Sequence, residues 1–185
     1  MATLPDQGEL VPIDWARNRE LLLKVCEPIV RGFVASRQAS GEVVLAIGYA
    51  FEFGTKQLCF DMCANTAREA DAAQQRTNAR NKRWNSGDYN FPGGVQEEFG
   101  DWGDEWWDEL RALDRLAEKS DMKAAVKDGI TEICCQVLAE LASGGVLGDW
   151  TTVDFNVAAL LDKVEVIEQR DGKIRKLIQS ASKKT

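Results

Sequence analysis

The stretch Gln96–Glu109 concentrates side chains that could bind a metal ion or a partner. It contains seven carboxylates, four aromatic rings and no basic residue. The acids are Glu97, Glu98, Asp101, Asp104, Glu105, Asp108 and Glu109, and the aromatics are Phe99, Trp102, Trp106 and Trp107. Carboxylates spaced three and four residues apart share one face of a helix, where their oxygens could ligate Mg²⁺ or Mn²⁺. The first chemistry to weigh is therefore that of an enzyme dependent on carboxylates and a divalent metal.

Two other interpretations of this stretch stay open. Exposed tryptophans among charges of one sign are typical of a surface that docks onto a basic protein, because the acids steer the encounter and the rings supply buried contact. Alternatively, the acids only stabilise a helix start, with Asp101 or Asp104 as its cap and the tryptophans in the core. A metal site usually draws ligands from a second element, and no matching acidic motif appears on the next predicted helix. We therefore expect neither a metal site nor a cofactor.

The remaining sequence argues against familiar catalytic machinery. The chain contains no histidine, which excludes Ser-His-Asp and Cys-His arrangements and zinc sites with two histidines. The pairs Gly93-Gly94 and Gly144-Gly145 do not match a phosphate-binding loop. The five cysteines are odd in number and irregularly spaced, which predicts free, buried thiols. We therefore predict no catalytic residues and a protein that is not an enzyme.

Size and charge set further bounds. At 185 residues the chain is expected to form a single domain, 1–185, with a sizeable core. A net charge of −7 argues against binding nucleic acid, because phosphates require a basic face, and favours a basic partner. The N-terminus has no signal-peptide pattern, and no apolar run approaches the roughly 20 residues that span a bilayer. These features predict a cytoplasmic protein that is not bound to a membrane.

The elements that would position the acidic stretch follow from periodicity. An apolar hairpin over about 43–66, with a turn at Gly54-Thr55-Lys56, predicts a central antiparallel β-sheet. Before it, apolar residues at helical spacing predict a helix from Trp15, capped by Asp14 and kinked or broken near Pro28. After it, a helical pair is expected over about 104–142. The predicted fold class is α+β, an antiparallel sheet covered by helices.

Two other regions flank this scaffold. An alanine-rich helix is expected over Ala67–Ala79, and the segment Lys82–Gly94 has the composition of a loop. This loop carries Trp84, Asp88 and Tyr89, and aromatic side chains of this size normally pack, so we expect it to be ordered and to share in binding. At the C-terminus, Val153–Leu161 fits a strand or a short helix, and the residues from Val164 fit a hairpin at Asp171-Gly172 or a helix.

The order of these elements, with Ala64-Asn65-Thr66 and Arg83-Trp84 followed by Asp88-Tyr89, resembles a family of small bacterial proteins. Members of that family are encoded beside polymorphic toxins and are candidate immunity proteins. The resemblance covers about 43–114 and carries no catalytic residues. Tyr89 stands where the family usually has tryptophan, and the acidic stretch that follows is particular to this chain.

The resemblance and the acidic stretch together predict a cytoplasmic immunity protein that binds and neutralises a cognate toxin. An acidic, aromatic patch would cover a basic active-site surface, such as that of a nuclease. The expected contact residues are Trp84, Asp88, Tyr89, Glu97, Glu98, Asp101, Trp102, Asp104, Glu105, Trp107, Asp108 and Glu109. Within this set we expect Trp102 and Trp107 to be exposed and Trp106 to face inward. A metal-dependent enzyme and a general protein-interaction adaptor are the alternatives, and the oligomeric state stays open.

Overall fold

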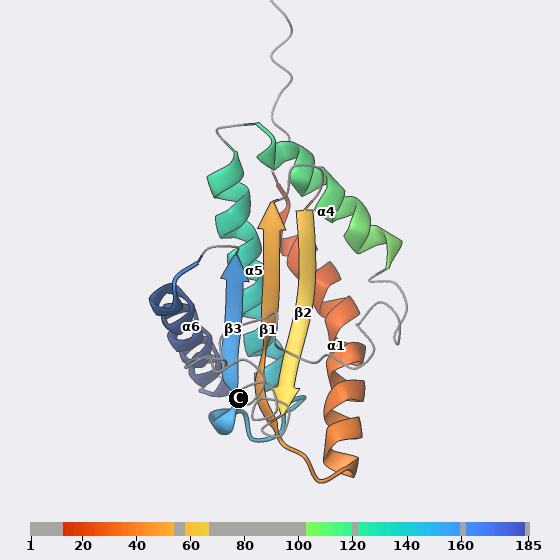
Figure 1. Cartoon of the computed structure of the whole chain (residues 1–185), viewed down its shortest axis with the longest axis vertical. Helices are drawn as coiled ribbons and strands as arrows, with labels where there is room; N and C mark the ends of the chain where they lie inside the picture. Colours follow the sequence, from red (N-terminus) through yellow and green to blue (C-terminus); the bar gives the residue numbers. More distant parts are fainter. Residues whose placement is uncertain (1–12, 54–57, 67–102, 120–121, 160–161, 184–185) are drawn as a thin grey trace, which may run out of the picture.

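A three-stranded sheet lies at the centre of the molecule, with long helices packed behind and beside it (Figure 1). The computed structural model describes residues 13–53, 58–66, 103–119, 122–159 and 162–183. The helices are α1 (Trp15–Ala39), α4 (Asp104–Ala117), α5 (Lys123–Ser143) and α6 (Val164–Ser182), with a 3-10 turn η3 (Trp150–Thr152). The strands are β1 (Val44–Phe53), β2 (Leu58–Thr66) and β3 (Asp154–Ala159).

The predicted hairpin is present, and it forms one side of the sheet. β1 and β2 pair antiparallel, with Tyr49 opposite Met62 and Phe51 opposite Phe60. These side chains lie on one face and are all buried, because alternate residues of a strand share a face. Tyr49 and Phe60 have ring centroids 5.5 Å apart, so the two strands also contact each other through aromatic rings on this face.

The prediction of a central antiparallel sheet is wrong. The strand order is β2-β1-β3, and β3 pairs with β1 in parallel, with Ile47 opposite Phe155 and Tyr49 opposite Val157. The sheet is therefore mixed, and helices rather than strands make up most of the regular structure. The reason is topological: β2, α4 and α5 lie between β1 and β3 in the chain, and a long connection of this kind can bring a strand back in parallel.

α1 confirms the predicted cap but not a break. The Asp14 side chain accepts a hydrogen bond from the Arg17 backbone N–H at 3.0 Å, as expected for an N-cap. The helix then continues through Pro28 as a single element of 25 residues. Leu22, Cys26 and Phe33 on its inner face are fully buried, so tertiary packing outweighs the backbone hydrogen bond that a proline removes.

The structure decides between strand and helix in both C-terminal segments. Residues 154–159 form strand β3, and the segment from Val164 forms helix α6, not a hairpin at Asp171-Gly172. Ile174 and Ile178 of α6 are fully buried, consistent with the helical spacing of apolar residues in this segment. The predicted helix Ala67–Ala79 and loop Lys82–Gly94 lie outside the described residues.

Candidate functional site

Helix α4 is the part of the acidic stretch that the structure describes, and its inner face anchors it. The residues at spacings of four, three and four, namely Trp106, Leu110, Leu113 and Ala117, are buried, as predicted for an inward stripe. Trp106 is fully buried and meets Phe60 of β2 edge-on, with ring centroids 5.6 Å apart. This contact fixes how α4 lies against the sheet, and therefore which of its residues face outward.

The outer side of α4 carries an acidic face, which consists of Asp104, Glu105, Asp108 and Glu109. Glu109 forms an ion pair with Arg17 of α1 at 3.2 Å, and Glu105 forms one with Lys24 of α1 at 3.5 Å. The side chains of Glu105 and Lys24 are 67% and 74% exposed, so their pair is solvent-screened and contributes little to stability. Half of the acidic face therefore points along α1 rather than away from the molecule.

Asp104 and Asp108 form the outermost part of the acidic face. Asp108 is 71% exposed at its side chain and pairs with Arg111 one turn later, at 2.6 Å. Asp104 is exposed and forms no ion pair within the described ranges. Neither aspartate forms an ion pair with α1 in this part of the chain. A partner could therefore bind Asp104 directly, and Asp108 in competition with Arg111, without loss of the α1–α4 ion pairs.

The cap of α4 differs from the predicted one. The N-cap is Gly103, with φ 81° and no side-chain cap hydrogen bond, and Asp104 is the first residue inside the helix. Positive φ is open to glycine at low cost, so the chain can turn sharply into α4 here. The carboxylates of Asp104 and Glu105 then lie in the first turn, where the helix dipole favours negative charge.

Trp107 is partly buried and packs against the hydrophobic core. The sequence predicted an exposed ring at this position. The ring is instead partly buried, so part of its surface stabilises the fold and is not open to a partner. The other predicted contact residues lie outside the described residues, and they are Trp84, Asp88, Tyr89, Glu97, Glu98, Asp101 and Trp102. The structure thus groups Asp104, Glu105, Trp107, Asp108 and Glu109 on one helix.

The described cysteines are not reactive groups. Cys26 and Cys134 are fully buried free thiols, as predicted, and so is Cys135. Burial raises the pKa of Cys26 to about 12, against a hydrogen bond from Tyr49 that lowers it. Burial likewise raises the pKa of Cys135 to about 11. Protonated, inaccessible thiols make poor nucleophiles and poor metal ligands.

The described ranges contain neither a metal-ligand set nor a membrane-spanning helix. No three His, Cys, Asp or Glu residues there come close enough to hold a metal ion. Within the same ranges, no helix is long and apolar enough to cross a bilayer.

Comparisons with models of protein families, with curated proteins and with solved structures find no match to this chain. The resemblance to proteins encoded beside toxins therefore stays a prediction that rests on the residues quoted for it.

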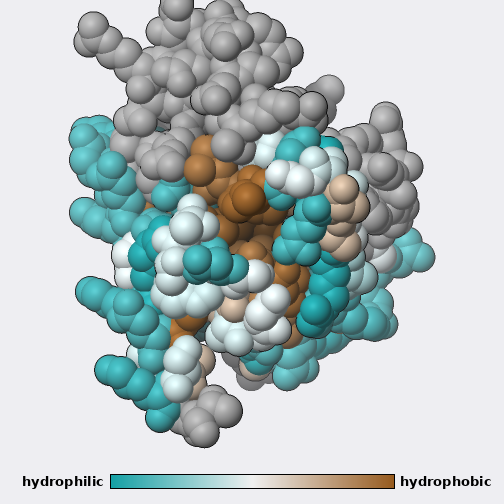
Figure 2. All heavy atoms as spheres, turned by 90° about the horizontal axis from the view of Figure 1, so that it is seen from below, coloured by the Kyte–Doolittle hydropathy of each residue, from teal (hydrophilic) through white to brown (hydrophobic). Residues whose placement is uncertain are grey.

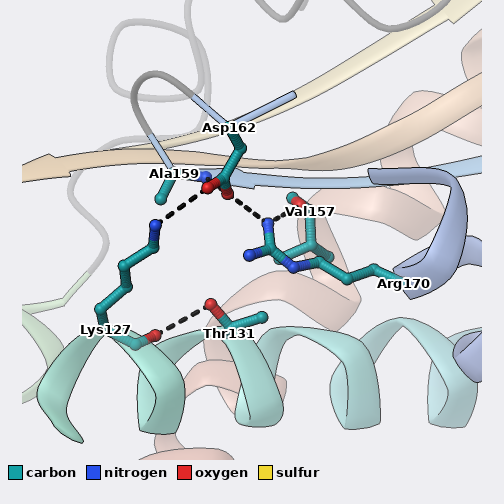
Figure 3. A network of polar contacts seen from close by, with 6 residues as sticks. All are labelled: Lys127, Thr131, Val157, Ala159, Asp162 and Arg170. Atoms are coloured by element: carbon teal, nitrogen blue, oxygen red, sulfur yellow. Dashed lines mark hydrogen bonds and ion pairs between the residues drawn. The ribbon is translucent and has the colours of Figure 1, made fainter. Parts of the chain in front are cut away.

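A second polar cluster, centred on Asp162, was not predicted from sequence. Asp162 precedes α6, and its side chain is only 8% exposed. Lys127 of α5 donates to it at 2.9 Å, Arg170 of α6 donates to its other oxygen, and the Ala159 backbone N–H of β3 donates at 2.8 Å (Figure 3). Burial raises the pKa of Asp162, but these hydrogen bonds lower it by more, so the carboxylate stays ionised.

A related pair, Asp171 and Arg175, directly follows Arg170 on α6. Asp171 accepts from the backbone N–H of Phe155 at 2.9 Å, and Arg175 donates to Asp171 at 2.7 Å. The four-residue spacing of Asp171 and Arg175 was the only sequence signal for these contacts, and it equally fits an exposed helical ion pair. Their bonds to β3 depend on tertiary structure, which a local pattern does not specify.

Proposed function

We propose that this protein is an immunity protein that binds a cognate toxin through the acidic face of α4. It acts by occupying a basic surface of the toxin, without chemistry of its own. The observation that carries the proposal is the arrangement of α4, in which a buried apolar stripe fixes the helix while Asp104 and Asp108 project outward. The resemblance over 43–114 supplies the class of partner.

The charge distribution supports a binding role. Long-range attraction between an acidic face and a basic partner raises the rate of association, and it acts without deep pockets or exact local geometry. The partly buried ring of Trp107 lies beside these acids in the sequence and offers apolar contact at the same helix. A toxin whose substrate is a polyanion would present the complementary basic surface.

The alternative of a metal-dependent enzyme has weaker support. Glu105 and Glu109, the acids that would join Asp104 and Asp108 in a ligand set, already pair with Lys24 and Arg17. A cation bound by these carboxylates would compete with Lys24 and Arg17 for them. No comparable observation in the described ranges favours the adaptor hypothesis over the immunity hypothesis.

The test starts by identifying a partner. The full chain, immobilised, is used to capture proteins from a lysate of its native host, and captured basic proteins are then expressed with and without the chain. We expect one of them to arrest growth alone and to be neutralised when the chain is present. Binding should weaken as salt is raised from about 0.05 to 0.5 M, because screening shortens the reach of the charges.

Charge reversal then assigns the surface. Asp104→Lys combined with Asp108→Lys alters the two acids that form no ion pair with α1, so α4 keeps its contacts to Arg17 and Lys24. The matched control reverses two exposed acids of α6, Glu165→Lys with Glu168→Lys. We expect the first double variant to lose at least about tenfold in affinity and to lose protection, while the control retains both. Full protection by the α4 variant would refute the surface assignment.

A further inference from the structure

The outer edge of β3 is bonded by side chains instead of by another described strand. β3 is at one end of the sheet, so only its inner side pairs with β1. On the outer side, Arg175 donates to the Val153 carbonyl at 2.7 Å and Arg170 donates to the Val157 carbonyl at 2.6 Å. The backbone N–H groups of Phe155 and Ala159 donate to Asp171 and Asp162, at 2.9 and 2.8 Å.

These four contacts follow the repeat of a β-ladder. Backbone groups of alternate residues point to the same side of a strand, so residues 153, 155, 157 and 159 share one edge. Side chains on or just before α6 bind them in the order carbonyl, N–H, carbonyl, N–H. Arginine supplies the donors and aspartate supplies the acceptors, so α6 substitutes for a fourth strand. An unprotected edge would invite pairing with another chain.

The contacts between α6 and the edge of β3 include one carboxylate that binds three elements. Asp162 joins three elements, because it accepts hydrogen bonds from Lys127 of α5, Arg170 of α6 and the Ala159 N–H of β3 (Figure 3). Lys127 and Arg170 are the charged groups that pair with it from the packed elements. Arg170 donates from the same Nη1 atom to Asp162 and to the Val157 carbonyl. The Asp162–Arg170 ion pair and the contact of Arg170 with the strand edge therefore depend on each other.

The apolar side of α6 is the second part of the attachment. Ile174 and Ile178 are fully buried in the core, while Arg170, Asp171 and Arg175 of the same helix are only partly buried. α6 therefore lies at the boundary of the fold, joined to the body by an apolar stripe, by the polar row along β3 and by an ion pair between Lys173 and Glu132 of α5. Elements at such boundaries open more readily than the central strands and helices do.

We propose that α6 is a latch on the outer edge of β3, pinned by Asp162, and that it opens as one unit while α1 and β1 remain folded. In the open form the backbone groups of residues 153, 155, 157 and 159 lose the side chains that bind them, and this edge of the sheet is uncovered. The latch thus controls access to the one sheet edge that α6 covers. This inference is independent of the acidic face of α4.

Hydrogen exchange resolved by residue tests the latch in the full chain. We expect the amides of α6, together with those of Phe155 and Ala159, to share one opening equilibrium that is more populated than the opening of α1. Its dependence on low concentrations of denaturant should also be weaker than that of α1, because less surface is exposed. A common opening of α6 and α1, with equal denaturant dependence, would overturn the proposal.

Asp162→Asn tests the pin, because it removes the charge and keeps the shape of the side chain. We expect the amides of α6, Phe155 and Ala159 to exchange about tenfold faster or more. Asp128→Asn, at an exposed position of α5, is the matched control and should leave their rates unchanged. Unchanged protection of α6 in Asp162→Asn would contradict the role of this carboxylate. If Asp162→Asn does not fold, Lys127→Met removes one donor, and the same residues must respond for the proposal to stand.

Discussion

Arg175 of α6 donates from Nη2 to the carbonyl oxygen of Val153 at 2.7 Å, although the two residues are 22 positions apart in the chain. The same guanidinium donates from Nε to Asp171, whose carboxylate accepts from the Phe155 N–H. Arg175 thus binds the Val153 carbonyl and also orients Asp171, which accepts from the Phe155 N–H. This relationship makes the stability of the β3–α6 region depend on charged side chains as well as on apolar burial.

Arg175→Ala should destabilise the protein by about 1–3 kcal/mol, because it leaves a partly buried carbonyl and carboxylate without this donor. Urea denaturation followed by circular dichroism measures the change. Lys176→Ala, at the neighbouring exposed position, is the control and should alter stability by less than about 0.5 kcal/mol. Equal effects of the two substitutions would show that the contact to Val153 contributes nothing.

Gly48→Ala should prevent stable pairing of β1 with β3. A Cβ atom at Gly48 would lie 1.7 Å from the backbone oxygen of Asn156, its partner in the register, and backbone atoms cannot move aside locally. We expect a loss above about 3 kcal/mol or a failure to fold. Gly172→Ala is the matched control, because nothing lies within 4 Å of its Cβ position in α6 and alanine favours helix by about 0.5–1 kcal/mol. A folded, equally stable Gly48→Ala protein would contradict the close approach.

The two adjacent tryptophans of α4 should differ in their effect on stability. Trp106 is fully buried, so Trp106→Ala should cost about 3–5 kcal/mol through lost burial and a large cavity. Trp107 is only partly buried, so Trp107→Ala should cost clearly less, about 1–2 kcal/mol. Thermal and urea denaturation of both variants provide the comparison. A larger loss for Trp107→Ala would reverse the assignment of inner and outer positions on α4.

The stabilising effect of Asp162 should vanish in acid. Burial raises its pKa, but the bonds from Lys127, Arg170 and Ala159 lower it by more, so the folded-state pKa lies below the unfolded one. A lowered pKa stabilises the fold above the unfolded value, and this contribution is lost as pH falls through the folded value. The difference in stability between the wild type and Asp162→Asn should therefore be largest at neutral pH and should narrow below about pH 4. A difference independent of pH would exclude the charge as its cause.

The sequence predicted those parts of the fold that local periodicity controls. The apolar run of β1, the alternation of β2, and the three- and four-residue spacing from Trp106 to Ala117 correspond to the observed hairpin and to α4. β3 was not predicted with certainty, because its six residues include Asp154 and Asn156, which disfavour strands. Its parallel pairing with β1 depends on contacts far apart in the chain, and these turn the expected antiparallel sheet into a mixed one.

In the candidate site, too, local spacing predicted which way side chains point, but not which partners they have. Helical spacing correctly placed Asp104 and Asp108 on the outside of α4 and Trp106 on the inside. The pairing of Glu105 with Lys24 and of Glu109 with Arg17 could not be predicted, because it depends on how α4 lies beside α1. Asp162 gave no sequence signal, since its partners come from two helices and a strand that only the folded chain brings together.

The buried thiols should resist alkylation in the folded protein. Burial raises the pKa of Cys26 to about 12, with the Tyr49 hydrogen bond opposing it, and burial raises that of Cys135 to about 11. At pH 8 almost no thiolate forms at either residue, and neither sulfur is accessible, so iodoacetamide should label both at least about 100-fold more slowly than in denaturant. Peptide mass spectrometry distinguishes these cysteines from the others in the chain. Rapid labelling of Cys26 under conditions where circular dichroism shows an intact fold would contradict its burial between α1 and the sheet, and would reopen a role for this thiol in chemistry.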